Sequence, residues 1–177
     1  GLLRDRTLSF TGEHYRVDGA TMHPGPVQSP RPPITIAGLG PVMMRHVARY
    51  ADTWSSLSFK DAVDEQLAET AERVVRMDEA CAALDRDPGT LRRSYLLYDG
   101  QARRRGGRYD YYLSVDAFET LAGRILELGM DEICLYFPPD PSQWPVFERI
   151  ATDVLPRLRT YVVEPGPGGK VNVRVLP

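Results

Sequence analysis

The chain has 177 residues, of which 42% are hydrophobic and 26% charged, and its 22 basic and 24 acidic side chains give a net charge of -2. This composition excludes an intrinsically disordered chain and argues against nucleic-acid binding through overall charge. A chain of this length can bury a substantial core without covalent staples.

Cysteine and histidine usage gives no sign of a disulfide or a metal site. Cys81 and Cys134 lie in apolar stretches without CxxC spacing, and the three histidines lack metal-ligand spacing. We therefore expect two buried free thiols, no metal and a cytoplasmic location. No apolar run approaches the roughly 20 residues that a membrane span needs, so we expect no membrane partner.

Residues 1–33 are predicted to form the end of a helix, a lid-like hairpin and a proline-rich extended insertion. Leu8–Phe10 and His14–Val17 have strand character, and Asp18-Gly19 is a dipeptide that favours tight turns. Five prolines between Met22 and Pro33 keep the following segment extended.

Residues 34–160 are predicted to form four strand-helix units. Apolar and β-branched runs mark the strands, 3.6-residue periodicity marks the helices, and Pro156 should kink or shorten the last helix. A Pro/Gly-rich tail at residues 161–177 has linker composition and one short predicted strand. The predicted strands are 34–37, 52–57, 93–98 and 131–137, and the predicted helices are 41–51, 61–84, 114–128 and 145–159.

Consecutive strand-helix units imply an α/β fold with parallel strands and right-handed crossovers. Two architectures fit: a small doubly wound domain, or the carboxyl-terminal half of a TIM-type (β/α)8 barrel, which typically needs about 250 residues. The chain starts at Gly1, without methionine and in what looks like the tail of a helix, which favours the barrel fragment. Such a fragment would expose two strand edges and one bare sheet face, so we expect association through those edges or a homodimer.

Ala37, Gly38, Leu39 and Gly40 form a glycine turn between a strand and a helix. Backbone N–H groups at such a turn, above the positive end of a helix, are suited to hold a phosphate. The alternative is that the glycines only satisfy the backbone angles of the turn. On the first interpretation, valine at Gly38 or Gly40 should weaken anion binding and leave folding intact.

The residues around this turn resemble those of a known family. PPITIAGLGP from Pro32 to Pro41, then Arg45 and VARYADTW ending at Trp54, resembles the PPIxIGGxGP and R-x-AArYADGW segments of the bacterial luciferase-like flavin and deazaflavin oxidoreductases. Phe10–Tyr15 resembles the family's FxGEHY. The segment from Ser114 to Glu132 resembles its approach to the last strand.

The resemblance implies a TIM-type barrel of which this chain is the carboxyl-terminal half. It implies that Ala37, Gly38, Leu39 and Gly40 bind the phosphate end of FMN or of the deazaflavin coenzyme F420, although Ala37 replaces the usual glycine. His14, in the lid-like hairpin, and Trp54 are candidate substrate or lid residues, although a tryptophan such as Trp54 is more often a core residue than part of a cofactor site. The catalytic residues are unknown and would lie in the first half of the barrel.

We therefore predict a luciferase-like oxidoreductase or monooxygenase acting on a small organic molecule. The alternative is a non-catalytic fragment that is inactive without the first half. Gln101–Tyr112 combines arginines with aromatic residues, which nucleic-acid binding would require. An ordinary solvated loop is the favoured interpretation, and no nucleic-acid partner is expected. A further alternative is that this loop attracts an anionic cofactor tail or substrate.

Overall fold

The computed structural model describes residues 1–5, 7–158, 161–165 and 171–175. The chain divides into a first unit, Gly1–Ile34, and a second unit, Thr35–Pro177. In the first unit, a short helix α1 (Leu2–Asp5) precedes two antiparallel strands, β1 (Thr7–Thr11) and β2 (Arg16–Thr21). The predicted hairpin is therefore present.

The reversal of this hairpin lies close to the predicted gap between the strands, but Asp18-Gly19 does not form the expected tight turn. The chain reverses at residues 12–15, where the Gly12 N–H donates to the Tyr15 carbonyl over 2.8 Å. Asp18-Gly19 lies inside β2 at a break in the strand register, opposite Ser9. Gly19 has a φ of +59°, and its N–H donates to the Ser9 hydroxyl over 3.0 Å. The dipeptide thus forms a β-bulge, which requires the same positive φ as a tight turn.

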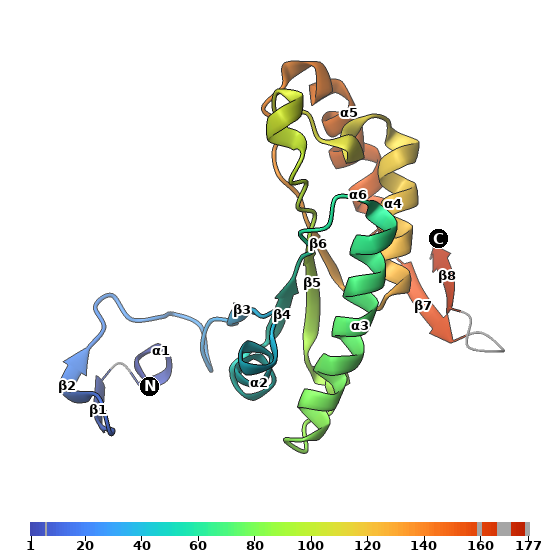
Figure 1. The fold of residues 1–177 in the computed structure, drawn as a ribbon. Helices are drawn as coiled ribbons and strands as arrows, with labels where there is room; N and C mark the ends of the chain where they lie inside the picture. The colour runs from blue at the N-terminus through green and yellow to red at the C-terminus, as the bar shows by residue number, and fades with distance from the viewer. Residues whose placement is uncertain (6, 159–160, 166–170, 176–177) are drawn as a thin grey trace. The chain divides into compact units, whose positions relative to one another are not determined.

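The second unit is built on a parallel sheet in the order β3-β4-β5-β6. Its helices alternate with the strands, and Figure 1 shows α3 and α4 beside β4, β5 and β6. The strands are β3 (Thr35–Ala37), β4 (Thr53–Ser56), β5 (Arg92–Leu96) and β6 (Glu132–Cys134). The main helices are α2 (Pro41–Tyr50), α3 (Val63–Ala82), α4 (Val115–Glu127), α5 (Trp144–Arg149) and α6 (Leu155–Leu158).

Strand order decides between the two predicted architectures. A doubly wound sheet reverses its strand order so that helices cover both faces. Here the spatial order follows the chain order, and right-handed crossovers then put every helix on the same face. The sheet is therefore a segment of a β/α barrel, with β3 and β6 at its edges among the described strands.

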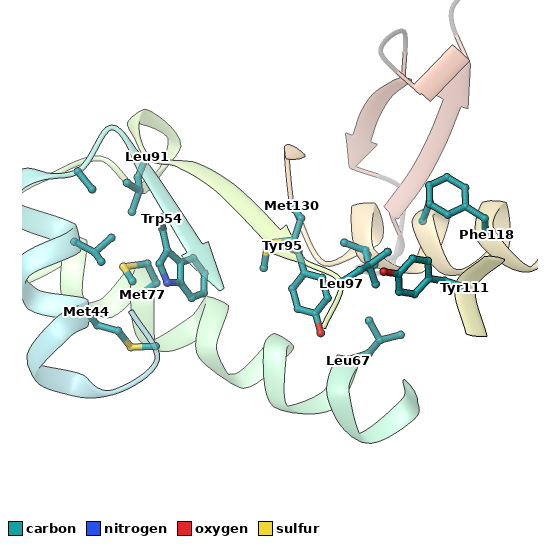
Figure 2. Packing of buried hydrophobic residues seen from close by; sticks show 14 of the residues in the cluster. Met44, Trp54, Leu67, Met77, Leu91, Tyr95, Leu97, Tyr111, Phe118 and Met130 are labelled. Carbon is teal, nitrogen blue, oxygen red and sulfur yellow. The ribbon is translucent and has the colours of Figure 1, made fainter. Parts of the chain in front are cut away.

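One hydrophobic core fills the space between the sheet and the helices. Trp54 and Tyr95 point into it from β4 and β5, and both are at most 1% exposed. Figure 2 shows the Trp54 ring near Met44 of α2 and Met77 of α3. Because all four strands present one face to this core, their other face, which we call the open face, carries the alternate residues. These are Thr35, Ala37, Thr53, Ser55, Arg92, Ser94, Leu96, Glu132 and Cys134.

The two cysteines lie in different environments. Cys81 is fully buried, as predicted, and burial raises the pKa of its thiol. Cys134 is exposed, so the expectation of a second buried thiol is wrong. It lies on the open face at the edge strand β6. Its thiol lies 3.3 Å from the Ser94 hydroxyl.

Local signals explain several helix boundaries. Ser114 caps α4 by accepting a hydrogen bond from the Ala117 N–H over 3.0 Å. Within the described residues, four 3-10 turns lie in the connections. Their bounds are Pro88–Thr90, Ala102–Arg105, Asp110–Tyr112 and Pro141–Gln143.

The last helix is irregular. A π-helical turn, Ile150–Val154, joins α5 to α6 and lies just before Pro156, whose missing N–H removes one helical hydrogen bond. Residue 159, the last of the predicted helix, lies outside the described residues.

The carboxyl-terminal tail contains two strands where one was predicted. β7 (Tyr161–Pro165) pairs antiparallel with β8 (Val171–Val175). In the described ranges, none of the helices is long and apolar enough to cross a bilayer.

Candidate functional site

Gly38 links the carboxyl end of β3 to β4. Its N–H donates to the Ser55 carbonyl over 3.2 Å, and its carbonyl accepts a hydrogen bond from the Trp54 indole nitrogen at 2.8 Å. Both backbone polar groups of Gly38 are therefore used inside the protein. Its N–H is not available to an anion in this conformation.

Gly38 is a packing residue, because a side chain there would overlap α2. A Cβ atom on Gly38 would lie 2.9 Å from Cγ2 of Val47, which is fully buried. The residue has no positive φ, so close approach of α2, and not backbone strain, explains the glycine. The expectation that Gly38→Val leaves folding intact therefore does not hold.

Gly40 has the opposite character. It is exposed, it is the N-cap of α2 with φ -108° and ψ 164°, and a Cβ there would meet no atom within 4 Å. No side chain caps the helix at this position. Pro41 occupies the first helical position and the Met44 N–H bonds to the Gly40 carbonyl over 2.9 Å. The N–H groups of Val42 and Met43, in the first turn, have no acceptor within an ordinary α-helix.

The same turn borders a cavity of about 440 Å³ between α2 and α3. Two guanidinium groups, of Arg45 and Arg76, line it together with one carboxylate, of Glu79. Arg76 also pairs with Glu72 at 3.3 Å. Leu39 is half-buried and lines this cavity, whereas Ala37 is exposed at the end of β3.

The other two predicted site residues, Trp54 and His14, do not line the cavity beside this turn. Trp54 is fully buried in the helix-side core, so its ring does not line the open face and its link to the turn is the hydrogen bond to Gly38. His14 lies in the hairpin turn of the first unit, where its side chain is 76% exposed and 4.0 Å from Glu13. Its predicted lid role stays a prediction.

An ion pair between buried Arg73 and half-buried Glu69 fixes the loop that follows β4. Arg73 donates to the Leu57 carbonyl over 2.5 Å and pairs with Glu69 at 2.8 Å. Glu69 accepts a hydrogen bond from the Ser58 hydroxyl at 2.5 Å. Arg73 is only 9% exposed. The loop thus has a fixed backbone beside the glycine turn.

The arginine-rich loop is more ordered than predicted. Arg105 forms ion pairs with Asp99 and Asp110, and Arg108 pairs with Asp140 at 3.5 Å. The backbone N–H of Ser142 is the main cause that lowers the pKa of Asp140. Two of the loop's positive charges are therefore balanced by acidic residues, which does not favour nucleic-acid binding.

The sequence interpretation missed that two tyrosines of this loop are buried in the core. Tyr111 and Tyr112 are at most 5% exposed and belong to the core. Burial is the main cause that raises the pKa of both hydroxyls, so both stay neutral. The signal in the sequence was three closely spaced tyrosines, in Tyr109-Asp110-Tyr111-Tyr112.

Among the residues that the structure describes, no group of three His, Cys, Asp or Glu side chains could hold a metal.

Sequential parallel strands, helices on one face and a glycine turn at the carboxyl end of a strand define a β/α-barrel segment of the kind that binds ligands at that end. The chain belongs to the luciferase-like monooxygenase family, whose model matches residues 1–98, more than half of its length.

Three solved structures share the fold. An F420-dependent secondary alcohol dehydrogenase in complex with an F420-acetone adduct has 15% identity and a TM-score of 0.58, over 84% of this chain and 57% of that one. The coenzyme F420-dependent tetrahydromethanopterin reductase from Methanopyrus kandleri has 12% identity and a TM-score of 0.62, over 85% and 58%. The monooxygenase RslO1 from Streptomyces bottropensis has 19% identity and a TM-score of 0.59, over 88% and 57%.

This chain therefore spans less than three-fifths of the length of these structures, since it covers 57%, 58% and 57% of them. The match fits a partial barrel.

Proposed function

We propose that the protein containing this chain is an oxidoreductase that uses a flavin-type cofactor, FMN or coenzyme F420, on a small organic substrate. This chain supplies the part of the barrel that holds the cofactor phosphate. Family membership supports the reaction class, and two of the structural neighbours are named as F420-dependent enzymes.

One observation carries the phosphate assignment: the uncapped amino end of α2 at Gly40. The N–H groups of Val42 and Met43, the positive end of the helix dipole and the open space at Gly40 fit a phosphate group. Arg45 adds a positive charge on the border of the adjoining cavity. The proposed binding segment is thus Leu39–Met43, with Gly38 as its fixed anchor.

In this proposal, the chain's own residues bind and orient the cofactor. Trp54 and Ser55 hold Gly38 through its carbonyl and its N–H. Arg73 and Glu69 hold the neighbouring loop. When bound, the cofactor would supply the redox chemistry, either hydride transfer or activation of oxygen.

The test is a titration of the complete protein with FMN, F420 and riboflavin, which lacks the phosphate. In Gly40→Val, the added Cβ would meet no atom within 4 Å, but the side chain would crowd the phosphate. FMN binding should weaken about tenfold, since a hydrogen bond to a charged group contributes about 1.5–3 kcal/mol. Riboflavin binding should stay within about twofold. Equal losses for both ligands would show that the turn is only structural, and no binding of FMN or F420 by the unchanged protein would refute the proposed function.

A further inference from the structure

Tyrosine rings stack at the carboxyl end of β5 and β6. The Tyr109 ring is nearly parallel to two others: Tyr136, with centroids 5.8 Å apart and planes at 12°, and Tyr111, at 5.1 Å and 17°. Both distances lie in the range of offset aromatic stacking. Exposure differs between the two outer rings, from 5% for Tyr111 in the core to 39% for Tyr136.

Hydrogen bonds fix the backbone that carries these rings. The Tyr109 N–H donates to the side-chain oxygen of Gln143 over 2.9 Å, and the Gln143 amide nitrogen donates back to the Tyr109 carbonyl over 2.7 Å. Gln143 is only 2% exposed. The Tyr112 hydroxyl donates to the Tyr136 carbonyl over 2.8 Å. A ligand that stacks here would therefore order few groups on binding, which lowers the entropic cost.

β6 ends at Cys134, and Tyr136 lies two residues beyond it. Glu132 and Cys134 lie on the open face, whereas Ile133 and Leu135 pack against the core. Extending this two-residue period past the strand end gives Tyr136 the side of the open face and Phe137 the helix side. The Phe137 ring agrees with this assignment, because it meets Phe147 of α5 at 5.2 Å.

The acidic residues of the adjoining loops are paired. Asp99 and Asp110 pair with Arg105, and Asp140 pairs with Arg108. The exposed end of the stack therefore offers an aromatic surface without an unpaired acid beside it.

We propose that Tyr136, backed by Tyr109, is a binding platform for a planar aromatic ring of the organic substrate. Assigning the ring to the substrate rests on the proposed function. The cofactor phosphate would lie at β3, and β6 is the opposite edge of the sheet, three strand spacings of about 4.8 Å away. A substrate at β6 and a cofactor anchored at β3 then meet over the open face.

The experiment compares two probes that differ in aromaticity, 2-naphthalenemethanol and its fully saturated decahydro analogue, on the complete protein. Dissociation constants are measured by ligand-observed NMR, together with the upfield shift of the probe's ring protons. The unchanged protein should prefer the aromatic probe about two- to tenfold, the range expected for one stacking contact. Tyr136→Leu should abolish both the preference and the upfield shift.

Two variants serve as controls. Tyr136→Phe keeps the ring and should keep the preference, and Phe137→Leu removes the adjacent exposed ring on the other side and should leave the preference unchanged. No binding or no preference in the unchanged protein would overturn the proposal, as would a preference that survives Tyr136→Leu. FMN titrations run in parallel distinguish a platform for the substrate from a platform for the cofactor. A Tyr136→Leu protein that loses FMN affinity by the same factor would assign the platform to the cofactor and refute the substrate assignment.

Discussion

The replacement Gly40→Asp should change stability and cofactor affinity in opposite directions. Gly40 has the extended backbone of an N-cap residue and room for a side chain. An aspartate there can accept a hydrogen bond from the N–H of Val42 or Met43, the second and third helical residues. Aspartate is a better N-cap than glycine by a few tenths of a kcal/mol, so thermal unfolding should shift upward by about 1 °C.

The same carboxylate occupies the donors that the phosphate would use. Loss of one hydrogen bond to a charged group costs about 1.5–3 kcal/mol, and charge repulsion between exposed groups adds up to about 1 kcal/mol. FMN affinity should therefore fall about tenfold to several hundredfold, whereas riboflavin affinity should stay within about twofold. Titration calorimetry measures the affinities for FMN and for riboflavin, and a thermal melt measures the stability.

Two further variants isolate the causes. Gly40→Asn caps the helix without adding charge, so its loss of FMN affinity should be smaller than that of Gly40→Asp. Gly123→Asp adds the same charge in α4, also at a position with no atom within 4 Å, and should leave FMN affinity unchanged. A Gly40→Asp protein that loses stability, or that loses FMN and riboflavin equally, would refute the assignment of this turn.

Two other replacements test packing and the ion pair between Arg73 and Glu69. Gly38→Ala should destabilise the protein by about 1–3 kcal/mol in thermal unfolding, because the added carbon overlaps α2; an unchanged melting temperature would mean that the turn can move aside. Arg73→Met should cost about 2–3 kcal/mol in urea unfolding, less than for a fully buried pair because Glu69 is 30% exposed. Arg76→Met breaks an exposed i,i+4 pair and should cost less than about 1 kcal/mol; equal losses would refute the distinction.

The sequence predicted the strand-helix units because their signals are local. The helix around Val47 and the strand around Trp54 show their periodicity within ten residues, and Ser114 marks a helix start by itself. Asp18-Gly19 was placed in the wrong element because a tight turn and a β-bulge both accept a positive φ. Strand order, which selected the barrel, is a property of the whole sheet.

The site was less predictable because its roles depend on contacts between separate segments. Gly38 and Gly40 look alike in the sequence, yet one packs against Val47 and the other faces open space. Only the structure distinguishes a packing glycine from a candidate binding glycine. Tyr136 lies 27 positions after Tyr109 in the sequence, so no local pattern indicates that their rings stack.

The positions of the two proposed sites make one joint prediction. Gly40 follows β3 and Tyr136 follows β6, at opposite edges of the sheet and roughly 14 Å apart by strand spacing. Effects of changes that far apart, without shared partners, usually add within about 0.5 kcal/mol. A Gly40→Asp/Tyr136→Leu double variant should thus show the FMN loss of the first change and the lost aromatic preference of the second, each within about twofold of the single variants. Isothermal titrations of all four proteins measure this. A larger deviation would mean that one ligand touches both edges, because a ligand spanning the sheet would couple the two changes.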